Sequence, residues 1–488
     1  MKFVIKIVFR KEINMLYKKN SEPKLALELF KNPTAEYRGT PFWSWNCKLD
    51  QKELDWQLEI FKKMGFGGAH MHVRTGMATR YLSDEHMSLI KGCIEKAKDE
   101  NMLAWLYDED RWPSGSAGGL VTREKRYRAR SLLFTAAPKA NSETVLSYAD
   151  VENRTAFAEQ GGLLACFDVE LDAAGNLVNW SKIDEHVPAQ HEKWYAYMEL
   201  QQESGWYNNQ TYVNTLDKAA IDRFIEITYE RYNQTIAEEF DKSVPAIFTD
   251  EPQFMTKTAL KYAKEKGSAI LPWTDDLPDT FAAAYEGEDL LGNLPELIWE
   301  RADGKASVIR YHYHDHVCER FASAFADNCG KWCEEHGLKL TGHVMREPSL
   351  RTQTNAIGEA MRLYRGFGMP GIDMLERNLE YTTAKQAQSA VHQFGREGML
   401  SEMYGVANWD FDFREHKMHG DWMAALGVTV RVPHLSWVSM AGESKRDYPA
   451  SIHYQSPWWE KYPLIEDHFA RVNTAMTRGK PQIGRAHV

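Results

Sequence analysis

Short apolar runs alternate with amphipathic stretches along most of this chain. Each run lacks a helical period and predicts a buried strand, whereas the stretch after it has the apolar spacing of a helix. The predicted strands are 38–46, 65–74, 102–110, 244–249, 338–344, 371–376, 398–405 and 428–434. This alternation indicates a parallel sheet with helical crossovers, and eight units predict an α/β fold closed into a (β/α)8 TIM barrel.

An open, doubly wound sheet is the alternative fold. It would need a glycine-rich, phosphate-binding turn after the first strand, whereas Trp45-Asn46-Cys47-Lys48 contains no glycine. We therefore expect the closed barrel.

The patterns divide the chain into five parts. Residues 1–37 form an N-terminal extension with a helix, residues 38–130 and 207–478 carry the barrel, and residues 131–206 form a small β-rich insertion. Within the second barrel part, residues 255–306 are a helical insertion in the loop after the fourth strand, where it can roof a site. Residues 479–488 do not resemble native sequence, and we expect them to be a non-native tail.

Composition and charge narrow the classes of function. The net charge of -10, without a basic stripe to offset the acids, argues against nucleic acid as a partner. No run is long enough to span a bilayer, and basic residues interrupt the apolar positions of residues 1–13, which makes a poor signal peptide. The six cysteines lack disulfide or zinc-ligand spacing. We therefore expect a cytoplasmic protein with no membrane partner.

The candidate chemistry lies at the ends of the predicted strands, which converge on one mouth in a barrel. The fourth run ends in two adjacent carboxylates, Asp250 and Glu251. Other strands also end in acids or histidines, and tryptophans lie nearby. Glycosidic bond cleavage needs one carboxylic acid to protonate the leaving oxygen and one carboxylate to activate water or attack carbon. Metal-dependent hydrolases would also fit this inventory.

Four segments together resemble glycoside hydrolase family 106, the α-L-rhamnosidase family. They are Pro41–Asn46, Tyr107–Gly119 with its distinctive Trp112-Pro113-Ser114-Gly115, Phe248–Pro252 and Ser401–Gly405. The resemblance implies an inverting glycosidase that removes terminal α-L-rhamnosyl or related deoxysugar residues from a polysaccharide or oligosaccharide. It makes a calcium ion plausible, with no organic cofactor, and a carbohydrate substrate as the partner.

The resemblance also places two catalytic carboxylates after the fourth and seventh strands, which match Glu251 and Glu402. We assign Glu251 as the general acid and Glu402 as the base that activates water. The reverse assignment stays open, because the environment sets which pKa is raised. The predicted substrate contacts are Trp45, His72, Asp108, Glu109, Trp112, Asp250, His343, Glu376, Trp409 and His434.

Several alternatives stay open. Retaining barrel glycosidases of the β-galactosidase type usually have Asn before the strand-four acid, a position that Asp250 holds here. A non-catalytic barrel would bind carbohydrate without turnover. We expect His70 and His72 to point to opposite faces of their strand, so that at most one of them faces the mouth. Asp108 and Glu109 either bind sugar hydroxyls or calcium, or act as structural acids near Arg111.

Overall fold

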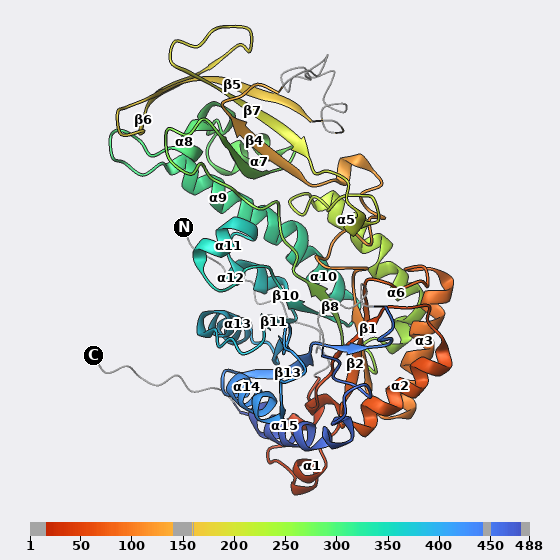
Figure 1. Ribbon diagram of the computed structural model, residues 1–488. Coiled ribbons are helices and arrows are strands. Elements are labelled where there is room, and N and C mark those ends of the chain that lie inside the picture. Colours follow the sequence, from red (N-terminus) through yellow and green to blue (C-terminus); the bar gives the residue numbers. More distant parts are fainter. Residues whose placement is uncertain (1–15, 140–158, 160, 443–449, 480–488) are drawn as a thin grey trace, which may run out of the picture.

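The computed structural model describes residues 16–139, 159, 161–442 and 450–479. Its centre is a nine-stranded parallel sheet in the order β13-β12-β11-β10-β8-β3-β2-β1-β14 (Figure 1). Strands β13 (Val428–Pro433) and β14 (Ser436–Trp437) are consecutive in the chain, and they pair with β12 and β1 respectively. The sheet is therefore a closed barrel of eight strands whose last strand is interrupted, which confirms the predicted fold.

The other barrel strands lie where the apolar runs predict them. They are β1 (Phe42–Trp45), β2 (Gly68–Val73), β3 (Leu103–Tyr107), β8 (Ala246–Asp250), β10 (Lys339–His343), β11 (Met369–Met374) and β12 (Met399–Met403). Alternate side chains point into the barrel, where Phe42, Trp105, Phe248, Leu400 and Val432 belong to one buried cluster. The intervening side chains face the helices.

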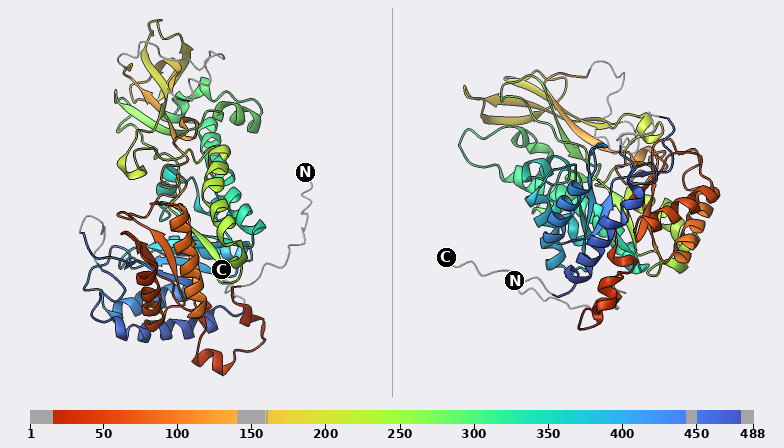
Figure 2. Two further views of the ribbon diagram at one scale, coloured as in Figure 1. Left: turned by 90° about the vertical axis from the view of Figure 1, so that its right-hand side faces the viewer. Right: turned by 60° about the horizontal axis from the view of Figure 1, so that its bottom comes forward.

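Helices surround the barrel (Figures 1 and 2). They are α2 (Gln51–Lys63), α3 (Asp84–Asp99), α5 (Lys218–Ile227), α6 (Tyr229–Ile236), α9 (Val308–Phe321), α10 (Asp327–Glu335), α13 (Tyr381–Gln393), α14 (Phe413–Ala425) and α15 (Pro463–Met476). A π-helical turn at Ala322–Ala326 joins α9 to α10. The extension contains α1 (Leu27–Lys31), and the short helices α11 (Leu350–Ala356) and α12 (Ala360–Leu363) follow β10.

A second, antiparallel sheet lies at the top of Figure 1, and loops from the C-terminal ends of β3 and β8 lead into it. Its strands are β4 (Arg130–Thr135), β5 (Gly162–Leu171), β6 (Leu177–Ile183), β7 (Glu192–Leu200) and β9 (Ser268–Trp273), in the order β6-β5-β7-β4-β9. Strand β9 comes from the segment predicted to be helical, which also contains α7 (Leu277–Ala284) and α8 (Pro295–Ile298). Its partner is the distant β4, which a local sequence pattern does not reveal.

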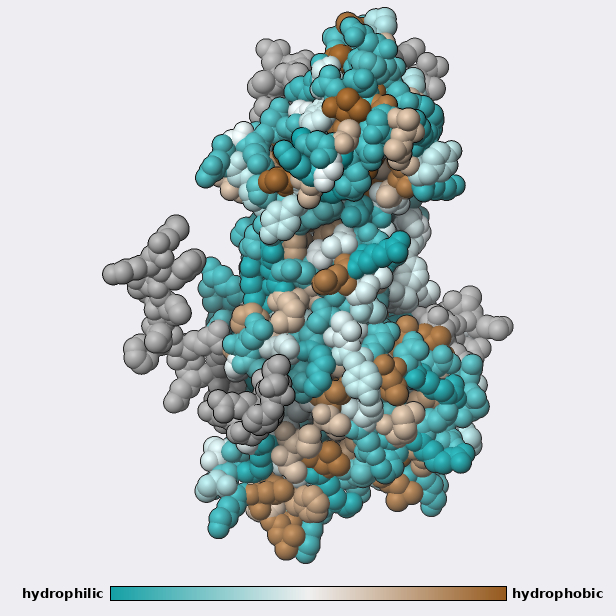
Figure 3. Space-filling model, turned by 90° about the vertical axis from the view of Figure 1, so that its left-hand side faces the viewer, coloured by the Kyte–Doolittle hydropathy of each residue, from teal (hydrophilic) through white to brown (hydrophobic). Residues whose placement is uncertain are grey.

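The surface seen in Figure 3 is mostly hydrophilic, and its apolar side chains lie in small separate groups. Among the described residues, no helix combines the length and the apolar character needed to cross a bilayer. All six cysteines are free thiols. The predicted non-native tail lies outside the described residues except for Gly479.

A buried ion pair fixes the last helix to the barrel. The Arg431 side chain of β13 points outward, and its Nη1 and Nη2 donate to Oε1 and Oε2 of Glu466 in α15, at 2.9 and 2.6 Å. The backbone N–H of Gly39 also donates to Glu466 Oε2, at 2.9 Å. Both charged side chains are almost fully buried, so each needs the other as its counter-ion.

We expect Glu466→Leu to lower the free energy of unfolding by roughly 3–5 kcal/mol, because it leaves the buried Arg431 guanidinium without a counter-ion. The double variant Arg431→Met/Glu466→Leu should be more stable than Glu466→Leu alone. Urea unfolding followed by circular dichroism measures both changes. Lys218→Gln, which breaks an exposed ion pair with Asp222, is the control and should have little effect. Equal stability of the single and double variants would contradict the expectation.

Candidate active site

Three polar side chains from neighbouring strands meet at the C-terminal end of the barrel. Asp250 ends β8, His343 ends β10, and Glu402 lies near the end of β12. All three are buried, and a ligand atom from each lies within 4.8 Å of the others. The register of the sheet brings them together, because His343 pairs with Asp250 and Glu402 pairs with Asp373 of β11.

His343 lies between the two carboxylates. Its Nε2 is 2.8 Å from Oε2 of Glu402 and 3.4 Å from Oδ1 of Asp250. Burial alone would lower the pKa of His343, but the hydrogen bond to Glu402 and the charge of Asp250 raise it well above its ordinary value. A protonated imidazole therefore donates to Glu402 at the centre of the mouth.

Glu402 is held in its ionised form. Burial opposes ionisation, but the hydrogen bond from His343 and the proximity of His434 outweigh it, so the pKa of Glu402 is lowered. His434 follows β13, and its Nε2 is 3.8 Å from Oε1 of Glu402. Both oxygens of this carboxylate thus face an imidazole.

Asp250 is held by its neighbours on the other side of the mouth. The hydroxyl of Tyr107 donates to Asp250 Oδ2 at 2.6 Å, and Nε2 of His72 lies 4.0 Å from the same oxygen. Arg74 Nη1 is 3.3 Å from His72 Nε2. Burial and this guanidinium keep the pKa of His72 well below its ordinary value, so His72 is neutral.

Glu251 has a different environment from Glu402. Its φ of 47° lies in the left-handed region, which costs strain for a residue with a Cβ and breaks the strand alternation after Asp250. Burial, followed by the negative charge of Asp250, raises the pKa of Glu251 to about 8. The charge of Glu402 contributes to this rise, whereas His343 opposes it. Near neutral pH, Glu251 is therefore a carboxylic acid beside an ionised Glu402.

Two further acids lie at the mouth, the partly buried Asp373 and the buried Glu347, although the sequence did not single them out as catalytic or substrate-binding residues. Burial and the charge of Glu402 raise the pKa of Asp373 well above its ordinary value, and burial raises the pKa of Glu347 to about 7. Within the described part of the chain, Asp373 Oδ1 and His343 Nδ1 are buried without a hydrogen-bond partner. Buried polar atoms normally have partners, so these two point to a polar ligand or water.

The Trp-Pro-Ser-Gly segment fixes the loop after β3 against the end of β8. Ser114 Oγ accepts from the backbone N–H of Asp250 at 2.8 Å and donates to Asp108 Oδ1 at 2.6 Å. The hydroxyl of Tyr229 donates to Asp108 Oδ2 at 2.9 Å. Since both oxygens of Asp108 accept from the protein, the geometry favours a structural role over the predicted substrate contact.

Glu109 organises the same loop from inside. Five backbone N–H groups donate to its buried carboxylate, from Asp110 and from the run Gly115, Ser116, Ala117 and Gly118. These donors favour the ionised form, although burial still raises the pKa of Glu109 to about 8. Glu109 is therefore a loop anchor, and it is the neighbouring Asp110 that pairs with Arg111, at 3.2 Å.

The predicted tryptophans lie in three different places. Trp45 is fully buried and packs edge to face on Trp43 and His86, because its position on β1 points outward to the helices. This placement corrects the prediction that Trp45 contacts substrate. The ring of Trp112 lies over the Arg74 guanidinium, 4.3 Å from ring centroid to Cζ, while Trp409 is 44% exposed in the loop after β12. Both remain predicted contacts.

The remaining predictions concern His70 and Glu376. His70 and His72 both point into the barrel and contact Phe42. The expectation of opposite faces was therefore wrong, because residues two apart on a strand share a face. Only His72 lies in the layer of Asp250, whereas His70 bonds the Thr40 carbonyl oxygen, at 3.0 Å from Nδ1. Glu376 follows β11 with a φ of 50°, and its side chain is 3.5 Å from Arg377.

Asp250, His343 and Glu402 are also the residues that could together hold a metal ion. They offer one nitrogen and carboxylate oxygens, whereas calcium takes about six to eight oxygen ligands. His343 would also have to lose the proton that the two carboxylates stabilise. This donor set does not suit calcium, so calcium stays a prediction from the resemblance.

Comparison with known proteins shows similarity in fold but not in sequence. No family model and no curated protein matches the sequence. Among solved structures, a rhamnosidase from Novosphingobium sp. PP1Y aligns with a TM-score of 0.64 and 13% identity, over 94% of this chain and 61% of that one. A β-galactosidase from Halorubrum lacusprofundi aligns with a TM-score of 0.45 and 11% identity, over 89% and 57% of the two chains. An endo-1,4-β-mannanase from Rhizomucor miehei aligns with a TM-score of 0.40 and 6% identity, over 89% of this chain and 95% of that one. This chain shares its barrel fold with the first of these and spans 61% of its length.

Proposed function

We propose that this chain is a glycoside hydrolase that removes terminal α-L-rhamnosyl or related deoxysugar residues by an inverting mechanism. The observation that carries the proposal is the opposite protonation of two carboxylates at one mouth: the pKa of Glu251 is raised to about 8, while that of Glu402 is lowered. Pairs of acids whose environments separate their pKa values are typical of general acid and base assignments. The proposed sugar and the proposed inversion of configuration come from the sequence resemblance to glycoside hydrolase family 106.

In the proposed reaction, Glu251 donates its proton to the glycosidic oxygen as the bond to the sugar breaks. Glu402 accepts a proton from the water that attacks the anomeric carbon. Protonated His343 orients Glu402 through the 2.8 Å contact and favours its ionised form. Asp373 Oδ1 and His343 Nδ1 offer an acceptor and a donor to sugar hydroxyls.

Replacement of each carboxylate should separate the two roles. Glu402→Gln should lower kcat by roughly 10²–10⁴ on every substrate, because it removes the base. Glu251→Gln should lower kcat similarly on an alkyl rhamnoside, but by less than about tenfold on a dinitrophenyl rhamnoside, whose leaving group needs no proton. Steady-state kinetics on the two substrates measures this difference. If the dinitrophenyl substrate instead rescues Glu402→Gln and not Glu251→Gln, Glu402 is the general acid and Glu251 the base.

Asp410→Asn is the matched control, because Asp410 is an exposed acid in the loop after β12 and should leave kcat unchanged. Proton NMR of the first sugar released reports its anomer, and an inverted product is expected. Retention, or a preference for an aryl β-D-galactoside, would instead favour the β-galactosidase-type alternative. Tight binding of sugar by wild type and both Gln variants, without turnover by any of them, would contradict the enzymatic proposal.

The pH profile of kcat/KM should have two limbs. Activity should fall as the pH rises through about 8, because Glu251 loses the proton it must donate. It should also fall below the ordinary glutamate value of 4.5, as Glu402 becomes protonated. With the dinitrophenyl rhamnoside the alkaline limb should weaken while the acid limb stays. An alkaline limb that is identical for both substrates would assign it to a group other than Glu251.

A further inference from the structure

The end of the barrel opposite the mouth contains a basic hollow. Its lining includes residues at or near the starts of β2, β3 and β8, namely Gly67, Leu103 and Ser243. The cavity has a volume of about 690 Å³ and adjoins a second one of about 230 Å³, with which it shares Lys19, Glu36, Leu103 and Lys242. Volumes of this size suit small-molecule ligands.

The charge of this hollow is opposite to that of the chain. Its two parts are lined by eight basic and three acidic residues, although the whole chain has a net charge of -10. Lysines near helix C-termini often only complement the helix dipole, and Lys62, Lys63 and Lys98 end α2 and α3. That explanation also extends to Lys19 and Lys242, which lie in or next to short helical turns at Lys18–Ser21 and Ala237–Glu239, but it does not cover Arg38.

Some of these cations already have anionic partners in the protein. Arg38 donates to Asp467 at 3.0 Å and to the Gly65 carbonyl at 2.8 Å, and Lys98 lies 2.6 Å from Glu239. By contrast, Lys62 and Lys242 make no ion pair with a described carboxylate, and Lys242 donates only to the Glu238 carbonyl, at 2.7 Å. Excess positive charge therefore remains in the hollow.

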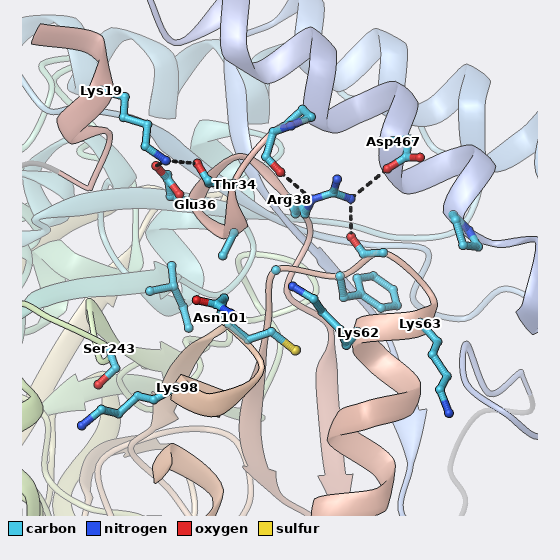
Figure 4. A pocket seen from close by; sticks show the side chains of 18 of the residues that line it. Lys19, Thr34, Glu36, Arg38, Lys62, Lys63, Lys98, Asn101, Ser243 and Asp467 are labelled. Atoms are coloured by element: carbon cyan, nitrogen blue, oxygen red, sulfur yellow. Dashed lines mark hydrogen bonds and ion pairs between the residues drawn. The ribbon is translucent and has the colours of Figure 1, made fainter. Parts of the chain in front are cut away.

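Lys62 occupies the centre of this arrangement. Figure 4 shows its side chain extending between Arg38 and Asn101, whereas Lys63 and Lys98 point away toward the rim. Partial burial, followed by the charge of Arg38, lowers the pKa of Lys62. Two like charges in one hollow repel each other, and an anion bound beside them would relieve that repulsion. Apolar side chains of Phe66, Met102 and Pro463 complete the lining.

We infer that this hollow binds a small ligand with two or more negative charges, seated at Lys62 and Lys242 and separate from the catalytic mouth. The ligand class is a phosphorylated or carboxylated small molecule, because ammonium groups bind both kinds of anion as point charges. Two adjoining cavities favour a ligand with anionic groups at separate positions. This inference does not depend on the proposed hydrolysis.

Isothermal titration with glucose 1,6-bisphosphate and with a trimer of uronic acid tests the inference. Glucose and a neutral trisaccharide are the ligand controls, and potassium chloride at matched ionic strength is the salt control. We expect saturable binding of at least one anionic probe and of neither neutral sugar. The probe that binds more tightly identifies phosphate or carboxylate as the natural group.

The variant Lys62→Gln/Lys242→Gln should weaken the Kd of that probe by about five- to tenfold, since two cations without ion pairs are removed. Lys52→Gln/Lys264→Gln is the matched control, because it removes the same charge from exposed lysines elsewhere and should leave the Kd unchanged. Hydrolysis of an aryl rhamnoside should be the same in both variants. Absence of probe binding, or equal weakening by the two double variants, would overturn the inference.

Discussion

The proton on His343 is the feature on which the mouth of this barrel depends. Asp250 and Glu402 come from strands on either side of His343 and β11, and both carboxylates are buried. Two anions so close in a desolvated site would repel each other strongly. A protonated imidazole between them balances one of the charges and gives each carboxylate a fixed partner. Without that proton, Glu402 would lose the hydrogen bond that lowers its pKa.

Glu251 remains protonated for a different reason. Burial and the negative charge of Asp250 raise its pKa to about 8, and the opposing charge of His343 does not outweigh them. Two glutamates at one mouth thus have opposite protonation, because Glu402 accepts the hydrogen bond of His343 whereas Glu251 is dominated by burial and by Asp250. The Ser114 contact to the Asp250 backbone supports the arrangement from the neighbouring loop.

The barrel itself was predictable because each strand carries its own signal. A buried parallel strand needs a short apolar run, and β8 or β12 shows one without reference to the rest of the chain. Long-range pairing carries no such signal, which is why β9 was missed. The alternation of side chains along each strand determines which residues reach the site. The side chains of Asp250 and Glu402 point into the barrel, as do those of Phe248 and Leu400, whereas that of Trp45 points outward. The same alternation places the Asp373 side chain on the inward face, so the sequence pattern also indicates Asp373 as a residue of the mouth. The five N–H donors around Glu109 could not be predicted, since they depend on the folded loop.

Acidic residues gather at the mouth of the barrel and basic residues at its opposite end, a distribution that the net charge of the chain does not reveal. The acids of the mouth lie at or just after strand ends, where burial raises the pKa of Glu251, Asp373 and Glu347 and two histidines lower that of Glu402. The lysines of the opposite end come from helix ends, the N-terminal extension and the turn before β8, so no stretch of sequence shows them as a basic stripe. The expectation drawn from a charge of -10 therefore applies to the chain as a whole, not to each surface. An anionic ligand would meet several cations at the end opposite the mouth, and it is the fold that brings these cations together.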